Sequence, residues 1–126
     1  EEQTANWQRT QGADLMSIWL SAGLKFDAVV ANNDEMAIGA ISAIEAAGKV
    51  PGKDILVLSI DGGKEAVQAV VDGKIAAVVE CNPRFGPKAY DTAAAYAAGE
   101  KIAPKIINPD QFYDAGNAAK LLSSAY

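Results

Sequence analysis

The sequence has no histidine and a single cysteine among its 126 residues. Without an imidazole, the chain cannot use histidine as a general base or as a metal ligand, so the commonest forms of those two chemistries are excluded. One cysteine cannot form a disulfide within the chain. Because Cys81 has no histidine partner and follows an apolar run, we interpret it as a packing residue and not as a nucleophile.

Clustered basic residues and long apolar runs are also missing. The 11 lysines and arginines are scattered and the formal net charge is −5, so we expect no nucleic-acid partner. No apolar run is long enough to span a bilayer. The chain begins Glu1-Glu2-Gln3 and shows no basic and apolar leader, so a signal peptide is not expected within this sequence.

Half of the residues are apolar, and their spacing alternates between the helical and the extended period. The predicted helices are residues 10–22, 34–47, 64–72, 84–98 and 114–124, and the predicted extended segments are residues 26–31, 55–60, 76–80 and 105–107. This alternation with short loops predicts an α/β fold with a parallel sheet. Residues 55–60 are almost wholly apolar, as expected for a strand covered on both faces. Only three strands are secure, which is few for an independent sheet of this class.

Polar side chains follow the ends of the three secure strands. Asn33 comes after the first, Asp61 after the second, and Glu80 ends the third. The carboxyl ends of parallel strands meet at one edge of a sheet, where open α/β sheets bind ligands. Amide and carboxylate groups suit the hydroxyls of a sugar, and Trp7 could cover an apolar sugar face. Asn33 and its neighbour Asp34 are also both suited to cap the following helix, and we assign the cap to Asp34.

The same acidic residues permit other chemistries. Asp61 and Glu80 could form the carboxylate pair of a glycosidase, although nothing in the sequence indicates a carboxyl group with a raised pKa. Asp34, Glu35 and Asp61 could form a metal site, but acidic residues at helix starts usually interact with the helix dipole. The Gly62-Gly63 pair belongs to neither a Walker motif nor a G-x-G-x-x-G motif. We therefore expect no catalytic residues, no cofactor and no metal.

Four segments carry a resemblance to a known family. They are Gln3-Thr-Ala-Asn-Trp-Gln-Arg9, Ala31-Asn-Asn-Asp-Glu-Met-Ala-Ile-Gly-Ala40, Ser59-Ile-Asp-Gly62 and Asp72-Gly-Lys-Ile-Ala76. Over nearly its whole length the chain resembles the C-terminal portion of the ribose-type periplasmic sugar-binding proteins of ABC transporters. The resemblance implies a partial parallel-sheet lobe of a type I periplasmic-binding-protein fold, a periplasmic location, a monosaccharide ligand and a membrane permease partner.

The resemblance also implies four ligand contacts. Trp7 matches an aromatic residue that stacks on the sugar, Asn33 matches an amide that binds its hydroxyls, and Asp61 matches a carboxylate ligand. Glu80 matches a polar residue beside the hinge, and a shifted match would put Cys81 or Asn82 in that place.

Family members have two lobes, and the chain resembles only part of the second. The resemblance assigns residues 1–81 to the second half of the C-terminal lobe, 82–112 to a hinge and crossover segment that packs on the N-terminal lobe, and 113–126 to a returning segment. We therefore expect exposed apolar faces, covered by a complementing chain or by self-association. Two alternatives stay open: the effector-sensing domain of a lac-repressor-like transcriptional regulator, and a truncated remnant that only self-associates.

Overall fold

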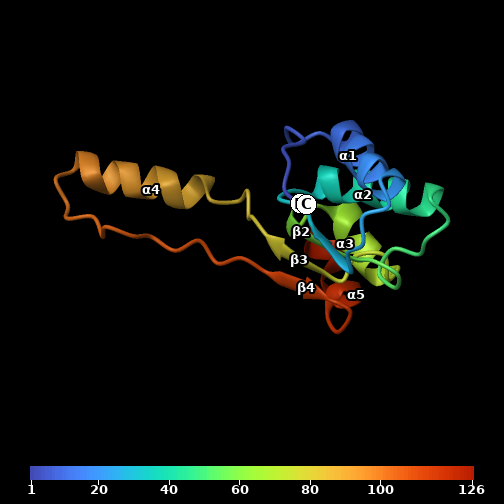
Figure 1. Ribbon diagram of the computed structural model, residues 1–126. Helices are drawn as coiled ribbons and strands as arrows, with labels where there is room; N and C mark the ends of the chain where they lie inside the picture. Colours follow the sequence, from blue (N-terminus) through green and yellow to red (C-terminus); the bar gives the residue numbers. More distant parts are fainter.

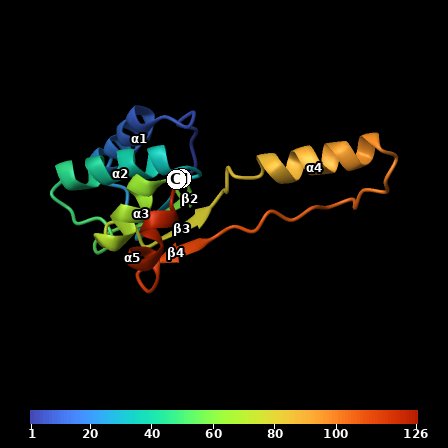
Figure 2. The same cartoon turned by 180° about the vertical axis from the view of Figure 1, so that it is seen from behind.

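The computed structural model describes residues 1–126 and consists of a compact body and a projecting arm (Figures 1 and 2). In chain order the elements are α1 (Arg9–Ser21), β1 (Ala28–Val30), α2 (Asp34–Ala46), β2 (Leu56–Asp61), α3 (Lys64–Val71), β3 (Ala77–Glu80), α4 (Gly86–Ala97), β4 (Phe112–Asp114), α5 (Ala118–Leu121) and the 3-10 helix η1 (Leu122–Ser124). The first seven agree with the elements predicted from the sequence to within a few residues. No helix has the length and apolar character needed to cross a membrane.

The four strands form one sheet in the order β1-β2-β3-β4. β1, β2 and β3 run parallel, as predicted, whereas β4 pairs antiparallel with β3. β4 is not among the predicted strands, and the helix predicted over residues 114–124 is wrong at its start. In the structure Asp114 ends the strand, its backbone N–H donates to Asn117 Oδ1 at 3.1 Å, and α5 begins only at Ala118.

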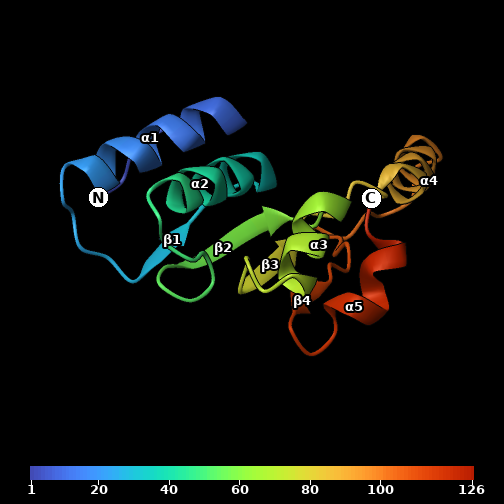
Figure 3. The same ribbon diagram turned by 90° about the vertical axis from the view of Figure 1, so that its right-hand side faces the viewer.

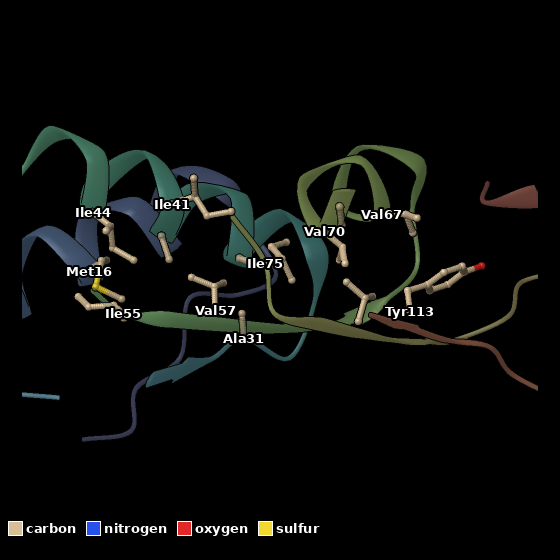
Figure 4. Close-up of a cluster of buried hydrophobic side chains, with 14 of the residues drawn as sticks. Met16, Ala31, Ile41, Ile44, Ile55, Val57, Val67, Val70, Ile75 and Tyr113 are labelled. Atoms are coloured by element: carbon tan, nitrogen blue, oxygen red, sulfur yellow. The ribbon is translucent and has the colours of Figure 1, made fainter. Parts of the chain in front are cut away.

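Helices cover only one face of the sheet. The buried side chains Val57 and Tyr113 point to the side where α2 and α3 lie, and α1 packs over α2 (Figure 4). The other face is open, so the prediction that residues 55–60 are covered on both faces is wrong. Five large apolar side chains stand exposed there, and we call them the bare sheet face: Val30, Leu56, Ile60, Val79 and Phe112.

The helices α1 and α2 approach each other through glycines. A Cβ atom at Gly12 would lie 2.7 Å from the carbonyl oxygen of Met36, and a Cβ at Gly39 would collide with the carbonyl oxygen of Arg9. Only glycine permits this approach. The close packing sets where the start of α1, and the loop before it, lie relative to the start of α2.

The arm consists of residues 82–111, namely α4 and its flanking segments. None of the residues of α4 is buried, and the helix extends away from the sheet (Figure 1). Its two connections to the body are tied together: the Asn82 backbone N–H donates to Asp110 Oδ1 at 3.0 Å, and Asn108 Nδ2 donates to the Asn82 carbonyl at 3.2 Å. α4 and the returning segment line an apolar groove of 730 Å³ with Phe85, Ala89, Ala93, Tyr96, Ile102 and Ile106 among its walls.

Candidate functional site

The candidate site lies where the parallel strands end and the helices begin. In Figure 3 the β2 arrow points toward the side of the molecule on which α2 starts. The loop before α1, the start of α2 and the turn between β2 and α3 are joined there by hydrogen bonds. The carboxyl edge predicted from the sequence is therefore a real feature of the fold.

Asn33 connects α2 to the loop that carries Trp7. Its Oδ1 accepts from the Met36 backbone N–H at 2.9 Å, which makes Asn33 the N-cap of α2. Its Nδ2 donates to the Trp7 carbonyl at 3.1 Å. Trp7 has a φ of +62°, a conformation uncommon outside glycine, and its side chain is 64% exposed. The tether thus presents a free indole beside the start of α2.

The assignment of the cap to Asp34 is wrong. Asp34 is 7% exposed, and its carboxylate points away from its own helix toward the end of β2. Oδ1 accepts from the Ser59 hydroxyl at 2.5 Å, and Oδ2 accepts from the backbone N–H groups of Gly62 at 3.0 Å and Gly63 at 2.7 Å. Asn33 and Asp34 both have short polar side chains, so the sequence alone does not show which of them caps α2.

Asp61 is half-buried at the end of β2 with a φ of +135°. Its Oδ2 is 3.4 Å from the backbone nitrogen of Asp34, and no cationic side chain is paired with it. Each carboxylate oxygen can accept two hydrogen bonds, so most of the acceptor capacity of Asp61 is free. Of the predicted site residues, it is the carboxylate with the most room for a ligand.

Glu80 stands beside Asp61 in the β2–β3 register but serves a different set of contacts. It is 4% exposed, and its Oε2 accepts from the Gln111 backbone N–H at 2.9 Å. Its Oε1 lies 3.5 Å from the Tyr113 hydroxyl and 3.7 Å from Arg84 Nη1. These contacts tie β3 to the returning end of the arm, so Glu80 is far less available to a ligand than Asp61.

Tyr126 reaches the same edge, which no pattern in the sequence predicts. Its carbonyl accepts from the Lys64 backbone N–H at 2.6 Å, next to the turn that follows Asp61. Burial, together with the negative charges of Asp61 and Asp34, raises the pKa of Tyr126 to about 12. The phenol therefore stays neutral and is a hydrogen-bond donor at the rim of the site.

An ion-pair cluster braces the three helix starts. The Arg9 guanidinium pairs with Glu35 on α2 at 2.9 Å and with Glu65 on α3 at 2.7 Å. The hydrogen bonds from Arg9 lower the pKa of Glu35. Glu35 is thus engaged by a cation of its own chain, and no group of three or more Cys, Asp or Glu side chains is arranged to hold a metal ion.

Comparison with known proteins shows the family of the chain. Residues 1–101 match the family described as periplasmic binding protein domain. The chain is 46% identical over 121 residues to the putative rhizopine-binding protein of Rhizobium meliloti, a match covering 95% of the chain and 39% of that protein. It is 39% identical over 104 residues to the ribose import binding protein RbsB of Escherichia coli K12, covering 82% of the chain and 34% of the relative.

Solved structures show the same partial correspondence. The binding protein of the arabinose ABC transporter from Shewanella sp. ANA-3, bound to L-arabinofuranose, superposes with a TM-score of 0.86 at 38% identity, covering 97% of the chain and 41% of that protein. A Mycobacterium smegmatis protein in complex with β-D-fucofuranose gives a TM-score of 0.88 at 40% identity, covering 96% and 40%. The chain spans about two fifths of the length of these relatives. It is part of a lobe of the type I fold and belongs to the periplasmic binding protein family, a family of solute-binding proteins and not of enzymes.

Proposed function

We propose that the chain forms part of the solute-binding component of an ABC sugar importer and binds a monosaccharide at the carboxyl edge of its sheet. The observation that carries the proposal is that Trp7, Asn33 and Asp61 meet at this edge: Asn33 bonds to the Trp7 carbonyl, and Asp61 contacts the backbone N–H of the residue after Asn33. Its support from the comparisons is that relatives named for sugar import cover most of the chain. A periplasmic location and a membrane permease partner belong to the same proposal.

The three residues offer complementary chemistry to a sugar. The exposed Trp7 indole presents a flat apolar face for the C–H face of a sugar ring. Asn33 keeps one amide hydrogen and one carbonyl lone pair after its two bonds to the protein, so it can donate to one hydroxyl and accept from another. Asp61 accepts from hydroxyls with its free oxygen positions. Once the complete binding protein encloses the ligand, a site of this kind would reject analogues that lack a hydroxyl, because the protein groups would then stay unpaired.

Glu80 is the fourth predicted contact, and its role in the proposal is narrower. Its carboxylate already holds the Gln111 N–H and lies near Arg84. The Glu80 carboxylate could bind a ligand only through a lone pair that these contacts leave free. We propose that Glu80 mainly fixes β3 against the returning segment, and that its effect on sugar affinity is smaller than that of Asp61.

The same proposal includes a further polypeptide that completes the binding protein, and the exposed apolar surfaces of the chain support it. The bare sheet face and the apolar groove of the arm are exposed on opposite parts of the molecule, and proteins normally cover apolar surfaces of this kind. The relatives are about two and a half times as long as the chain, so they contain further segments that could cover these apolar surfaces. We propose that a complementing segment or chain covers both surfaces, and that without it the chain self-associates.

The site is testable without the complementing polypeptide. Half of a cleft binds weakly, so ligand contacts are best followed by two-dimensional ¹H–¹⁵N NMR at millimolar concentrations of D-ribose, D-fructose, L-arabinose, D-galactose and myo-inositol. At least one of these should shift the Trp7 indole signal and the backbone signals of Asn33 and Asp61. Shifts confined to the groove of the arm, or no shift with any of the five, would contradict the proposed site.

A further inference from the structure

The turn after β2 has an unusual backbone. Asp61 has a φ of +135° and Gly62 a φ of +91°, and the first of these lies in a region that side chains rarely adopt. Gly62 is enclosed as well, because a Cβ there would lie 3.0 Å from Tyr113 Cε2 and 3.1 Å from Glu80 Cγ. A conformation of this kind persists only where surrounding groups hold it.

Asp34 is the group that holds this turn. Its Oδ2 accepts the backbone N–H groups of both residues that follow Asp61, at 3.0 and 2.7 Å. Its Oδ1 accepts the Ser59 hydroxyl from within β2, so the carboxylate contacts the chain before and after Asp61. Hydrogen bonds to an ionised acceptor are about twice as strong as neutral ones, and those from Ser59 and Gly62 to Asp34 are buried.

The same residue also contacts Asp61 directly. The backbone N–H of Asp34 points to Asp61 Oδ2 at 3.4 Å. Asp34 therefore fixes Asp61 at two levels, through the backbone of the turn and through one carboxylate oxygen. The second oxygen of Asp61 is left free for other partners.

We propose that Asp34 is a positioning residue for the sugar site: it touches no ligand, and its buried carboxylate holds Asp61 in the conformation that presents the Asp61 carboxylate to the sugar. The effect on ligand binding rests on the proposed function. The clamp on the turn does not, so the two can be tested apart.

The clamp is tested first in the wild-type chain without ligand. A long-range HNCO experiment should detect scalar coupling across the hydrogen bonds from the Gly62 and Gly63 amides to the Asp34 carboxyl carbon. Amide hydrogen exchange then compares Asp34→Asn and Asp34→Ala with Asp27→Asn, which makes the same change at an exposed aspartate before β1, away from the turn. We expect protection at Gly62 and Gly63 to fall about tenfold in Asp34→Asn and further in Asp34→Ala, and to be unchanged in Asp27→Asn.

Absent coupling in the wild-type chain would overturn the clamp, whether or not the variants fold. Equal protection of the two glycine amides in Asp34→Asn and Asp27→Asn would overturn it as well. For the effect on the ligand, Asp34→Asn should weaken binding of the best sugar of the NMR panel about tenfold, while Asp27→Asn leaves it unchanged. If the wild-type chain binds no sugar, the proposed function fails. The clamp is then still decided by the scalar coupling and by amide hydrogen exchange.

Discussion

Asn33 donates a hydrogen bond from Nδ2 to the Trp7 carbonyl at 3.1 Å, although the two residues are 26 positions apart in the chain. The same side chain caps α2 through Oδ1. One amide thus joins the start of a helix to the loop that carries the exposed indole. The candidate site depends on this link, because it holds Trp7 in a left-handed conformation together with the turn closed by the Gln8 backbone N–H on the Ala5 carbonyl at 2.9 Å.

Replacing Asn33 should therefore affect both stability and the position of Trp7. In Asn33→Ala we expect the free energy of unfolding to fall by about 1 kcal/mol from the lost cap, and somewhat more from the lost tether. Urea unfolding measures the first effect, and the NMR signal of the Trp7 indole reports the second. Asn32→Ala is the matched control, because Asn32 is exposed and makes no such bond. Equal stability of the two variants would contradict the role of Asn33.

Replacing Gly39, where α1 crosses α2, should destabilise the fold. A methyl group at this position meets the Arg9 carbonyl oxygen, so Gly39→Ala must push the helices apart and is expected to cost about 1–3 kcal/mol of unfolding free energy. Gly86→Ala is the control, since a Cβ at the start of α4 meets nothing within 4 Å. Thermal unfolding followed by circular dichroism distinguishes the two. A Gly39→Ala variant as stable as Gly86→Ala would show that the helices do not pack this closely.

Two adjacent carboxylates should give opposite pH dependences of stability. Burial raises the pKa of Asp34 from its ordinary value of 3.8, while the bonds from Ser59 and Gly63 oppose the rise and the charge of Asp61 adds to it. The folded state then binds this proton more tightly than the unfolded state. The stabilising contribution is complete below the unfolded pKa and is lost as the pH rises through the raised pKa.

The measurement is the free energy of unfolding from about pH 4 to pH 7 for the wild type and Asp34→Asn. The wild type should lose stability relative to the variant as the pH rises. Glu35 behaves in the reverse sense: Arg9 lowers its pKa, so its contribution is present above the unfolded pKa and is lost as the pH falls through the lowered value. A wild type that gains stability over Asp34→Asn with rising pH would contradict the burial of Asp34. Tyr126 lies near both Asp34 and Asp61, and because its pKa is raised to about 12 it stays neutral throughout this range.

The bare sheet face should make the isolated chain associate. Leu56 and Ile60 are 45% and 37% exposed, so replacing both with lysine removes apolar surface at little cost to the fold. We expect the wild type to elute as an oligomer in gel filtration with light scattering, and Leu56→Lys/Ile60→Lys to shift toward the monomer. Val57→Lys, on the covered face at 0% exposure, should instead prevent folding. A wild-type chain that elutes as a well-folded monomer would contradict the proposal that another polypeptide covers the bare sheet face.

Local signals in the sequence predicted most of the fold. Glycines with positive φ follow α1, α2, α3 and α4 at Gly23, Gly48, Gly73 and Gly99, as expected for helix C-caps. The apolar run at residues 55–60 correctly predicted the central strand β2. The predictions that failed concern contacts between residues far apart in the chain. β4 is three residues long and exists because it pairs with β3, more than 30 positions earlier, and nothing in the local sequence specifies that pairing.

The candidate site was predicted in outline and missed in its connections. Chain topology alone places Asn33, Asp61 and Glu80 at one edge, because parallel strands end there. Short polar residues can cap, clamp or bind, and the choice depends on contacts made across the fold. The interpretation from sequence therefore places the N-cap of α2 at Asp34 instead of Asn33, and it does not include the contacts that occupy the Glu80 carboxylate.

The most direct test of the account is the sugar affinity of Asp61 variants, measured by calorimetry or NMR titration with the best sugar of the panel, in the chain and in the complete binding protein. Asp61→Ala should abolish detectable binding, and Asp61→Asn should weaken it strongly, since a neutral amide replaces a free carboxylate. Asp91→Ala, which removes an exposed charge from α4, should bind like the wild type. Unchanged affinity in Asp61→Ala would contradict the placement of the sugar site at this edge of the sheet.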